Sequence, residues 1–147
     1  MQLTFNPTIT AGAYTSGMCV GGKLSLPKLG PATGRVAVVD VVLIDKSAQP
    51  GSYELHFFDD DLVGAVTDHV AYAVVALDLP KSQGHLTIAG LASLGANGGE
   101  ITLSNIYKRL TLPKGDAWAV LLTKGTPTYV GNKDLILKVT TELVGAV

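Results

Sequence analysis

The feature that most constrains the fold of this chain is a succession of short apolar segments separated by glycine- and proline-bearing turns. The clearest segment is residues 35–45, RVAVVDVVLID, in which valine dominates. Branching at Cβ stiffens the valine side chain and suits a pleated sheet. Neither alternating face of this segment is plainly polar, so we expect the strand to lie between two layers. No long amphipathic helix is available to connect parallel strands, which predicts an antiparallel, all-β protein.

Further segments are rich in apolar side chains and bounded by turn residues, as strands are, and residues 53–58 and 134–143 also alternate apolar and polar side chains. The segments are residues 53–58, 85–89, 100–112, 117–124 and 134–143. The sequence PKGD joins the third of these segments to the fourth, which predicts that the two form a hairpin. The spacing of the segments predicts an antiparallel β-sandwich of the jelly-roll or Greek-key kind, with one or two short helical turns.

The region from residue 67 to residue 82 fits more than one structure. Residues 67–79, TDHVAYAVVALDL, fit either a helix that begins at an Asp68 cap or another apolar strand. Residues 78–82 fit a short helical turn, because Asp78 can cap it and proline two places later is tolerated in a first turn.

The length of 147 residues and the even composition predict a single β-sandwich domain over residues 1–147. A chain of this size buries roughly two thirds of the surface that its unfolded form exposes, so it needs no disulfide or metal to form a core. Residues 1–30 contain short apolar pieces separated by glycine and proline. They form either an extended N-terminal arm that adds an edge strand to a neighbour, or the first strands of the sandwich.

The chain is unusually poor in charge. Charged residues make up 16% of it and hydrophobic residues 47%, where about 25% charged is typical of soluble domains. The surface is therefore either that of a compact β protein with threonine, serine and glycine outside, or one that other subunits partly cover. The net charge is −1 and the lysines are scattered, which argues against nucleic-acid binding.

The sequence also bears on where the protein is made. No stretch approaches the roughly 20 apolar residues that cross a bilayer, and the first ten residues lack the regions of a signal peptide. The one cysteine, Cys19, cannot form an internal disulfide and suits a reducing compartment. We therefore expect synthesis in a cytoplasm and no membrane partner.

Residues 16–25, SGMCVGGKLS, come close to the spacing of a phosphate-binding loop, with a glycine, four residues, then Gly22 and Lys23. That motif needs serine or threonine directly after the lysine, and a helix that follows. Leu24 stands in the place of the serine, and Pro27 would stop a helix at once. We therefore interpret the glycines as turn positions and expect no nucleotide or other cofactor.

No other motif indicates catalysis or metal binding. The aspartates at 59–61 are consecutive, whereas calcium ligands usually alternate, so we expect a charged strand end exposed to water. The histidines His56, His69 and His85 lack the i, i+4 spacing of a helical zinc pair, and no nucleophile elbow accompanies them. An enzyme that acts on cell-wall polymers would need a carboxylate pair, which we do not locate. We therefore predict a non-enzymatic protein without catalytic, cofactor-binding or metal-binding residues.

Four groups of residues occur in a characteristic order. They are YTSG (14–17) followed by VGG (20–22), LIDKS (43–47), LHFFD (55–59) and LLTKGTPTY (121–129). Together they resemble a family of small tailed-bacteriophage virion proteins found among head genes, over a span from about Tyr14 to Leu143. The resemblance implies a capsid decoration or cement protein that binds the major capsid protein on the outside of the phage head and stabilises it. It also implies a homotrimer at local threefold positions, made in the bacterial cytoplasm and located on the capsid surface of the virion.

Interfaces of this kind have aromatic or aliphatic anchors inside a polar rim. Tyr14 and Tyr129 are the candidate interface residues, whereas Trp118 alternates within a strand and is expected in the core. The alternative function is a phage tail or fibre receptor-binding module that recognises a host glycan through an aromatic-lined groove. One tryptophan and five tyrosines give that alternative little support.

Overall fold

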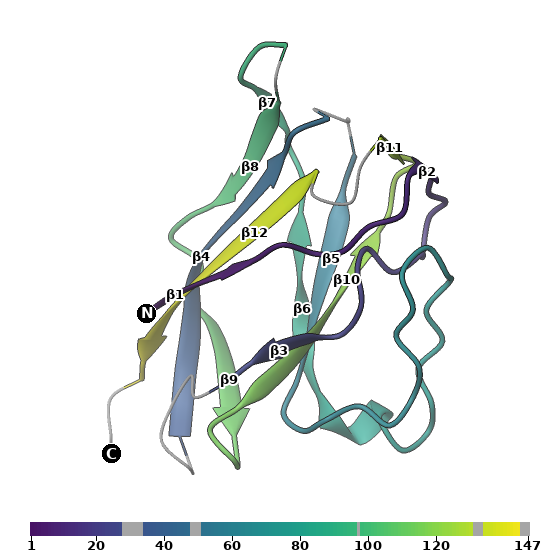
Figure 1. Ribbon diagram of the computed structural model, residues 1–147. Helices are drawn as coiled ribbons and strands as arrows, with labels where there is room; N and C mark the ends of the chain where they lie inside the picture. The colour runs from purple at the N-terminus through teal and green to yellow at the C-terminus, as the bar shows by residue number, and fades with distance from the viewer. Residues whose placement is uncertain (28–33, 48–50, 97, 131–133, 145–147) are drawn as a thin grey trace.

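The computed structural model describes residues 1–27, 34–47, 51–96, 98–130 and 134–144 (Figure 1). Within these residues the chain forms two antiparallel sheets on either side of an apolar core, and a short two-stranded ladder. This arrangement confirms the prediction of an all-β antiparallel sandwich. No helix of the described residues is long and apolar enough to span a membrane.

The first sheet has six strands, in the order β1-β12-β4-β8-β7 with β9 also paired to β4. These strands are β1 (Gln2–Phe5), β4 (Gly34–Asp45), β7 (Ala92–Ser93), β8 (Gly99–Leu103), β9 (Lys108–Leu112) and β12 (Leu135–Leu143). The second sheet has four strands in the order β3-β10-β5-β6. These strands are β3 (Leu24–Leu26), β5 (Tyr53–Phe58), β6 (Ser82–Ile88) and β10 (Ala117–Thr123). The short ladder joins β2 (Gly12–Ala13) to β11 (Thr128–Tyr129).

Strands far apart in the sequence are neighbours in both sheets. β12 lies between β1 and β4, and β10 lies between β3 and β5. This non-sequential order is typical of Greek-key connections and differs from a simple meander. All three N-terminal strands pair with strands of the same chain: β1 with β12, β3 with β10 and β2 with β11. Residues 28–30 of the segment considered as an arm lie outside the described residues.

β4 is the central strand of the first sheet. The positions that it buries in the core are even-numbered in its first half and odd-numbered in its second half. Its register against β12 slips by one residue, which leaves Val39 as a bulge. Val36 and Val38 before the bulge, and Val41 and Leu43 after it, are all buried in the same core. Because the bulge shifts the buried positions by one residue, apolar side chains are needed on both alternating faces of the sequence, and neither face is plainly polar.

Residues 100–112, expected to form one strand, form two. β8 ends at Leu103 and β9 begins at Lys108, and between them Asn105 has a φ of +55°, which a strand residue does not adopt. β8 pairs with the C-terminal half of β4 and β9 with its N-terminal half. The break therefore lies opposite the bulge in β4, where the ladder is already interrupted.

The predicted hairpin between residues 100–112 and 117–124 is wrong. β9 belongs to the first sheet and β10 to the second, so residues 113–116 carry the chain from one sheet to the other. β10 is apolar on both faces and almost wholly buried, which suits a central position between β3 and β5.

Residues 67–79 form neither the helix nor the regular strand that their pattern allowed. The structure shows a loop there, with isolated bridges at Asp68 and Ala71. The predicted short helical turn is confirmed as η1 (Leu79–Lys81), with Pro80 in its first turn. Asp78 precedes η1, but its carboxylate accepts no hydrogen bond from the turn's own amides.

Gly21 allows two N-terminal segments to lie close together. It has a φ of +79°, and its N–H donates to the Asp68 carboxylate at 2.7 Å. A Cβ placed on Gly21 would lie 2.7 Å from the Cβ of Pro7, far inside normal contact. Lys23 forms an ion pair with Asp61. In this structure, therefore, the glycines and lysine of residues 16–25 make contacts within the fold.

We expect Gly21→Ala to destabilise the domain by about 2 kcal/mol or more, because a positive φ alone costs a side chain about 1–2 kcal/mol and the new Cβ also meets Pro7. Gly22→Ala is the matched control, because Gly22 has an ordinary φ and its nearest neighbour would be the Val66 carbonyl oxygen at 3.7 Å. We expect the control to change stability by less than about 1 kcal/mol. Urea unfolding of both variants measures the difference, and equal effects would contradict the steric argument.

Candidate interaction surface

The most distinctive surface of the molecule is a segment that follows β5 and ends at the first residue of η1, which we call the apolar loop (residues 63–79). It lies along one side of the second sheet (Figure 1). Six of the eleven large apolar side chains that are exposed among the described residues belong to it. They are Val63, Val70, Val74, Val75, Leu77 and Leu79.

The apolar loop carries almost no charge on its outer side. Between Asp68 and Lys81 the one carboxylate is that of Asp78, which is buried, and no lysine or arginine occurs. Leu77 at 74% is the most exposed of the loop's large apolar side chains. A concentrated, uncharged apolar surface of this kind marks an interaction site more often than scattered single residues do.

The underside of the loop packs on the outer face of the second sheet. A small apolar cluster forms there, separate from the main core, and Val66 and Tyr72 of the loop pack against it. Its buried members are Cys19, Phe58, Leu62, Val120 and Leu122. Trp118, expected in the core, is half-buried beside this cluster. Burial raises the pKa of the Cys19 thiol, which suits a packing role for this residue.

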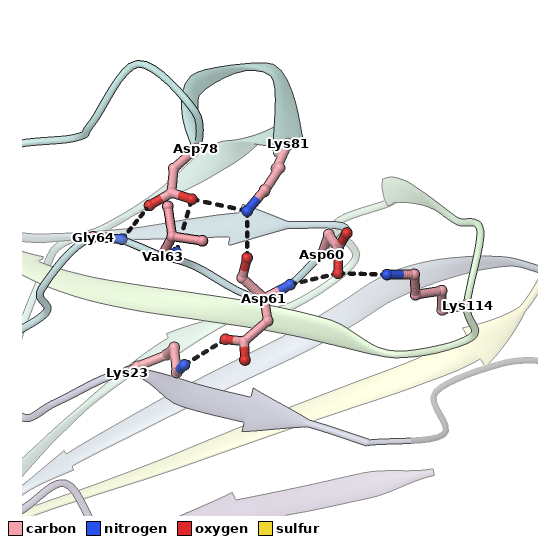
Figure 2. Close-up of polar contacts among 8 residues, drawn as sticks. All are labelled: Lys23, Asp60, Asp61, Val63, Gly64, Asp78, Lys81 and Lys114. Atoms are coloured by element: carbon pink, nitrogen blue, oxygen red, sulfur yellow. Dashed lines mark hydrogen bonds and ion pairs between the residues drawn. The ribbon is translucent and has the colours of Figure 1, made fainter.

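Asp78 holds the C-terminal end of the loop. Its carboxylate accepts hydrogen bonds from the N–H groups of Val63 at 2.9 Å and Gly64 at 2.8 Å, and from the Lys81 ammonium at 2.9 Å (Figure 2). Burial by itself would raise the pKa of Asp78, but these three bonds outweigh it and lower the pKa to about 2. Lys81 also donates to the Asp61 carbonyl oxygen, so one ammonium links Asp78 to the chain just before the loop.

The three consecutive aspartates at 59–61 are engaged in contacts with other elements. Lys114, in the turn before β10, pairs with Asp60 at 2.8 Å, and Lys23, before β3, pairs with Asp61 (Figure 2). Hydrogen bonds from these two lysines lower the pKa values of the two carboxyl groups. Asp59 accepts a bond from the Gln83 amide at 2.8 Å. The described residues contain no group of three potential ligands placed for a metal ion.

Asp68 holds the middle of the loop. It accepts hydrogen bonds from the Thr10 N–H and hydroxyl, at 2.8 and 2.7 Å, and from the Tyr14 hydroxyl at 2.8 and 2.9 Å to its two oxygens. It also accepts the Gly21 N–H bond described above. Next to it the His69 N–H donates to the Cys19 carbonyl at 3.0 Å. The loop is thus joined to residues 10–21 by both side-chain and backbone bonds.

Tyr14 and Tyr129, the predicted interface residues, lie in the core. Their exposures are 0% and 1%, and their rings meet edge to face with centroids 5.4 Å apart. Tyr129 shares a hydrogen bond with the hydroxyl of Tyr53, whose pKa burial raises to about 12. Neither ring lies on a surface that a partner could meet. Tyr14 instead contributes indirectly, because its hydroxyl helps to position Asp68.

The apolar loop is visible in the sequence as the uncharged run after Asp68. The pattern of this run predicted a helix or a strand and did not predict an exposed loop. The two aspartates that hold the loop carry no motif of their own. Their partners at Thr10, Gly21 and Val63 become visible only in the folded chain.

No model of a known protein family matches the chain, and no curated protein sequence matches it significantly. A functional conclusion therefore depends on the geometry of the surface and on the resemblance given above.

We expect Asp78→Asn to remove part of the acid sensitivity of the domain. The pKa of Asp78 falls from its ordinary value of 3.8 to about 2 on folding, so the ionised carboxylate stabilises the fold fully above about pH 4, and this stabilisation is lost as the pH falls toward 2. Urea unfolding at several pH values measures the effect. Asp60→Asn is the control, because Asp60 belongs to a partly exposed pair and contributes less. An unchanged acid profile in Asp78→Asn would contradict the anchoring role.

Proposed function

We propose that this chain is a non-enzymatic structural protein of a bacteriophage particle, and that it decorates the outside of the head by binding the major capsid protein. The observation that carries the proposal is the apolar loop: a concentrated, uncharged and exposed surface on a domain otherwise closed around its core. The resemblance to head-associated virion proteins supplies the identity of the partner. The proposal includes assembly as a homotrimer on the capsid surface.

The way the loop is held suits a docking role. Asp68 and Asp78 fix its backbone in the free protein, so a partner need not order it on binding. Fully covering a leucine such as Leu77 contributes roughly 1.5–3 kcal/mol before the costs of association. Many copies on one shell need only modest affinity for each contact, because a bound neighbour raises the effective concentration of the next contact.

The alternative, a glycan-binding module of the tail or fibre, requires aromatic side chains on the surface. Among the described residues Tyr107 is the exposed large aromatic side chain, at 55%, and the Arg109 guanidinium carbon lies 5.4 Å from the centroid of its ring. A single exposed ring makes a poorer sugar platform than the apolar loop makes a protein-docking surface. We therefore favour attachment to the shell.

We expect Leu77→Asp to weaken attachment to empty shells of the phage that encodes the chain by at least about tenfold, which corresponds to about 1.4 kcal/mol. The charge would have to be desolvated beneath the partner. The variant should unfold like the wild type, because Leu77 is 74% exposed. Cosedimentation with shells, followed by a titration, measures the affinity.

Leu94→Asp is the matched control, because Leu94 is 64% exposed and lies outside the apolar loop. Equal attachment of the Leu77 variant and the wild type would exclude the loop as the docking surface. Labelling of native particles in the electron microscope tests the location separately. Label confined to the tail would refute decoration of the head and favour the glycan-binding alternative.

A further inference from the structure

A pair of histidines lies on the outer face of the second sheet. In this antiparallel ladder His56 of β5 stands directly opposite His85 of β6. The two rings are stacked, with centroids 4.9 Å apart and planes inclined by 22°. Directly opposed residues of neighbouring strands are the positions from which two side chains can reach one common atom. This contact is independent of the apolar loop and plays no part in the proposed function.

A carboxylate sets the orientation of one ring. His56 Nε2 lies 3.0 Å from a carboxylate oxygen of Glu54, which the Lys124 ammonium also approaches at 3.4 Å. A glutamate side chain is ordinarily ionised at neutral pH. An ionised carboxylate only accepts hydrogen bonds, so Nε2 of His56 carries the proton and donates it. Nδ1 of a neutral His56 then keeps a free lone pair.

This arrangement matches the way proteins prepare a histidine for metal binding. A metal-ligating histidine commonly donates its other ring N–H to a carboxylate, which fixes the tautomer and raises the basicity of the ligating nitrogen. Imidazole nitrogen is a preferred ligand of Zn²⁺, Ni²⁺ and Cu²⁺, whereas Mg²⁺ and Ca²⁺ prefer oxygen. Charged groups of both signs lie around the two rings. The Glu54 carboxylate contacts His56, the Lys124 ammonium approaches that carboxylate, and the Lys108 ammonium lies beside Gly84, next to His85. Thr87, opposite Glu54 in the ladder, is uncharged.

We propose that His56 and His85 together bind a late divalent transition-metal ion, such as Zn²⁺ or Ni²⁺, through one ring nitrogen each, with Glu54 as the positioning residue behind His56. The stacked rings turn about the broad χ2 torsion of histidine to direct both nitrogens to one ion, at about 2.0–2.1 Å from each. Since the described residues offer no third ligand at this place, water completes the coordination. The ion would join the edge strand β6 to β5 next to η1, where the apolar loop ends.

The test uses the full chain without a histidine tag. Isothermal titration with ZnCl₂ and with NiCl₂ at neutral pH should give one bound ion per chain, and excess metal should raise the melting temperature. Binding should weaken on acidification, because metal ligands must be deprotonated. MgCl₂ should give no heat of binding. Long-range ¹H–¹⁵N spectra should show the His56 and His85 ring nitrogens shifting with added Zn²⁺.

His56→Gln and His85→Gln should each weaken the binding of Zn²⁺ and Ni²⁺ by at least about tenfold. His69→Asn is the control, because its ring bonds the Ala13 carbonyl, at 2.7 Å, and asparagine tolerates the positive φ of this position. Metal-free melting curves establish that each variant is folded. The proposal would be overturned if the wild type bound neither metal or if either glutamine variant bound as tightly as the wild type. Loss of binding in His69→Asn would also overturn it. None of these outcomes depends on whether the chain attaches to a capsid.

Discussion

The pairing of β4 on both of its edges is the constraint on which the rest of the sandwich depends. One edge binds β12, which in turn holds β1, and the other edge binds β8 and β9 in succession. Because β9 must leave this sheet before β10 enters the other, the chain has to cross between layers at residues 113–116. The bulge at Val39 lets a single strand serve both partners while its buried valines stay in one core.

Two carboxylates hold the apolar loop, the buried one of Asp78 and the partly buried one of Asp68. A loop without a ladder must satisfy its backbone N–H groups elsewhere, and Asp78 accepts bonds from those of Val63 and Gly64. Asp68, in the loop itself, accepts the N–H of Gly21 and so joins the loop to the N-terminal segment. These bonds are charge-assisted and therefore stronger than bonds between neutral groups. They hold an apolar segment on the surface in a defined conformation, which its own side chains could not do in water.

The parts of the fold that could be predicted are those governed by local pattern. Residues 53–58 and 134–143 alternate around one buried face, and the structure forms β5 and β12 there. The parts of the fold that local pattern does not predict depend on contacts between residues far apart in the sequence. Asn105 interrupts the pattern of residues 100–112 with a positive φ, opposite the bulge in β4. The buried Tyr14 bonds through its hydroxyl to Asp68, 54 positions away. No local signal distinguishes a tyrosine buried by such a contact from one on an interface.

The low charge of the chain had two interpretations, and the placement of its exposed apolar side chains bears on both. If threonine, serine and glycine merely replaced charges over the whole surface, the exposed valines and leucines should be spread evenly. Among the described residues they are concentrated in residues 63–79, while Leu94 and Leu143, for example, stand apart from them. A concentrated, uncharged apolar surface reduces solubility unless another molecule covers it. This concentration supports our proposal that a second protein covers part of the domain at the apolar loop.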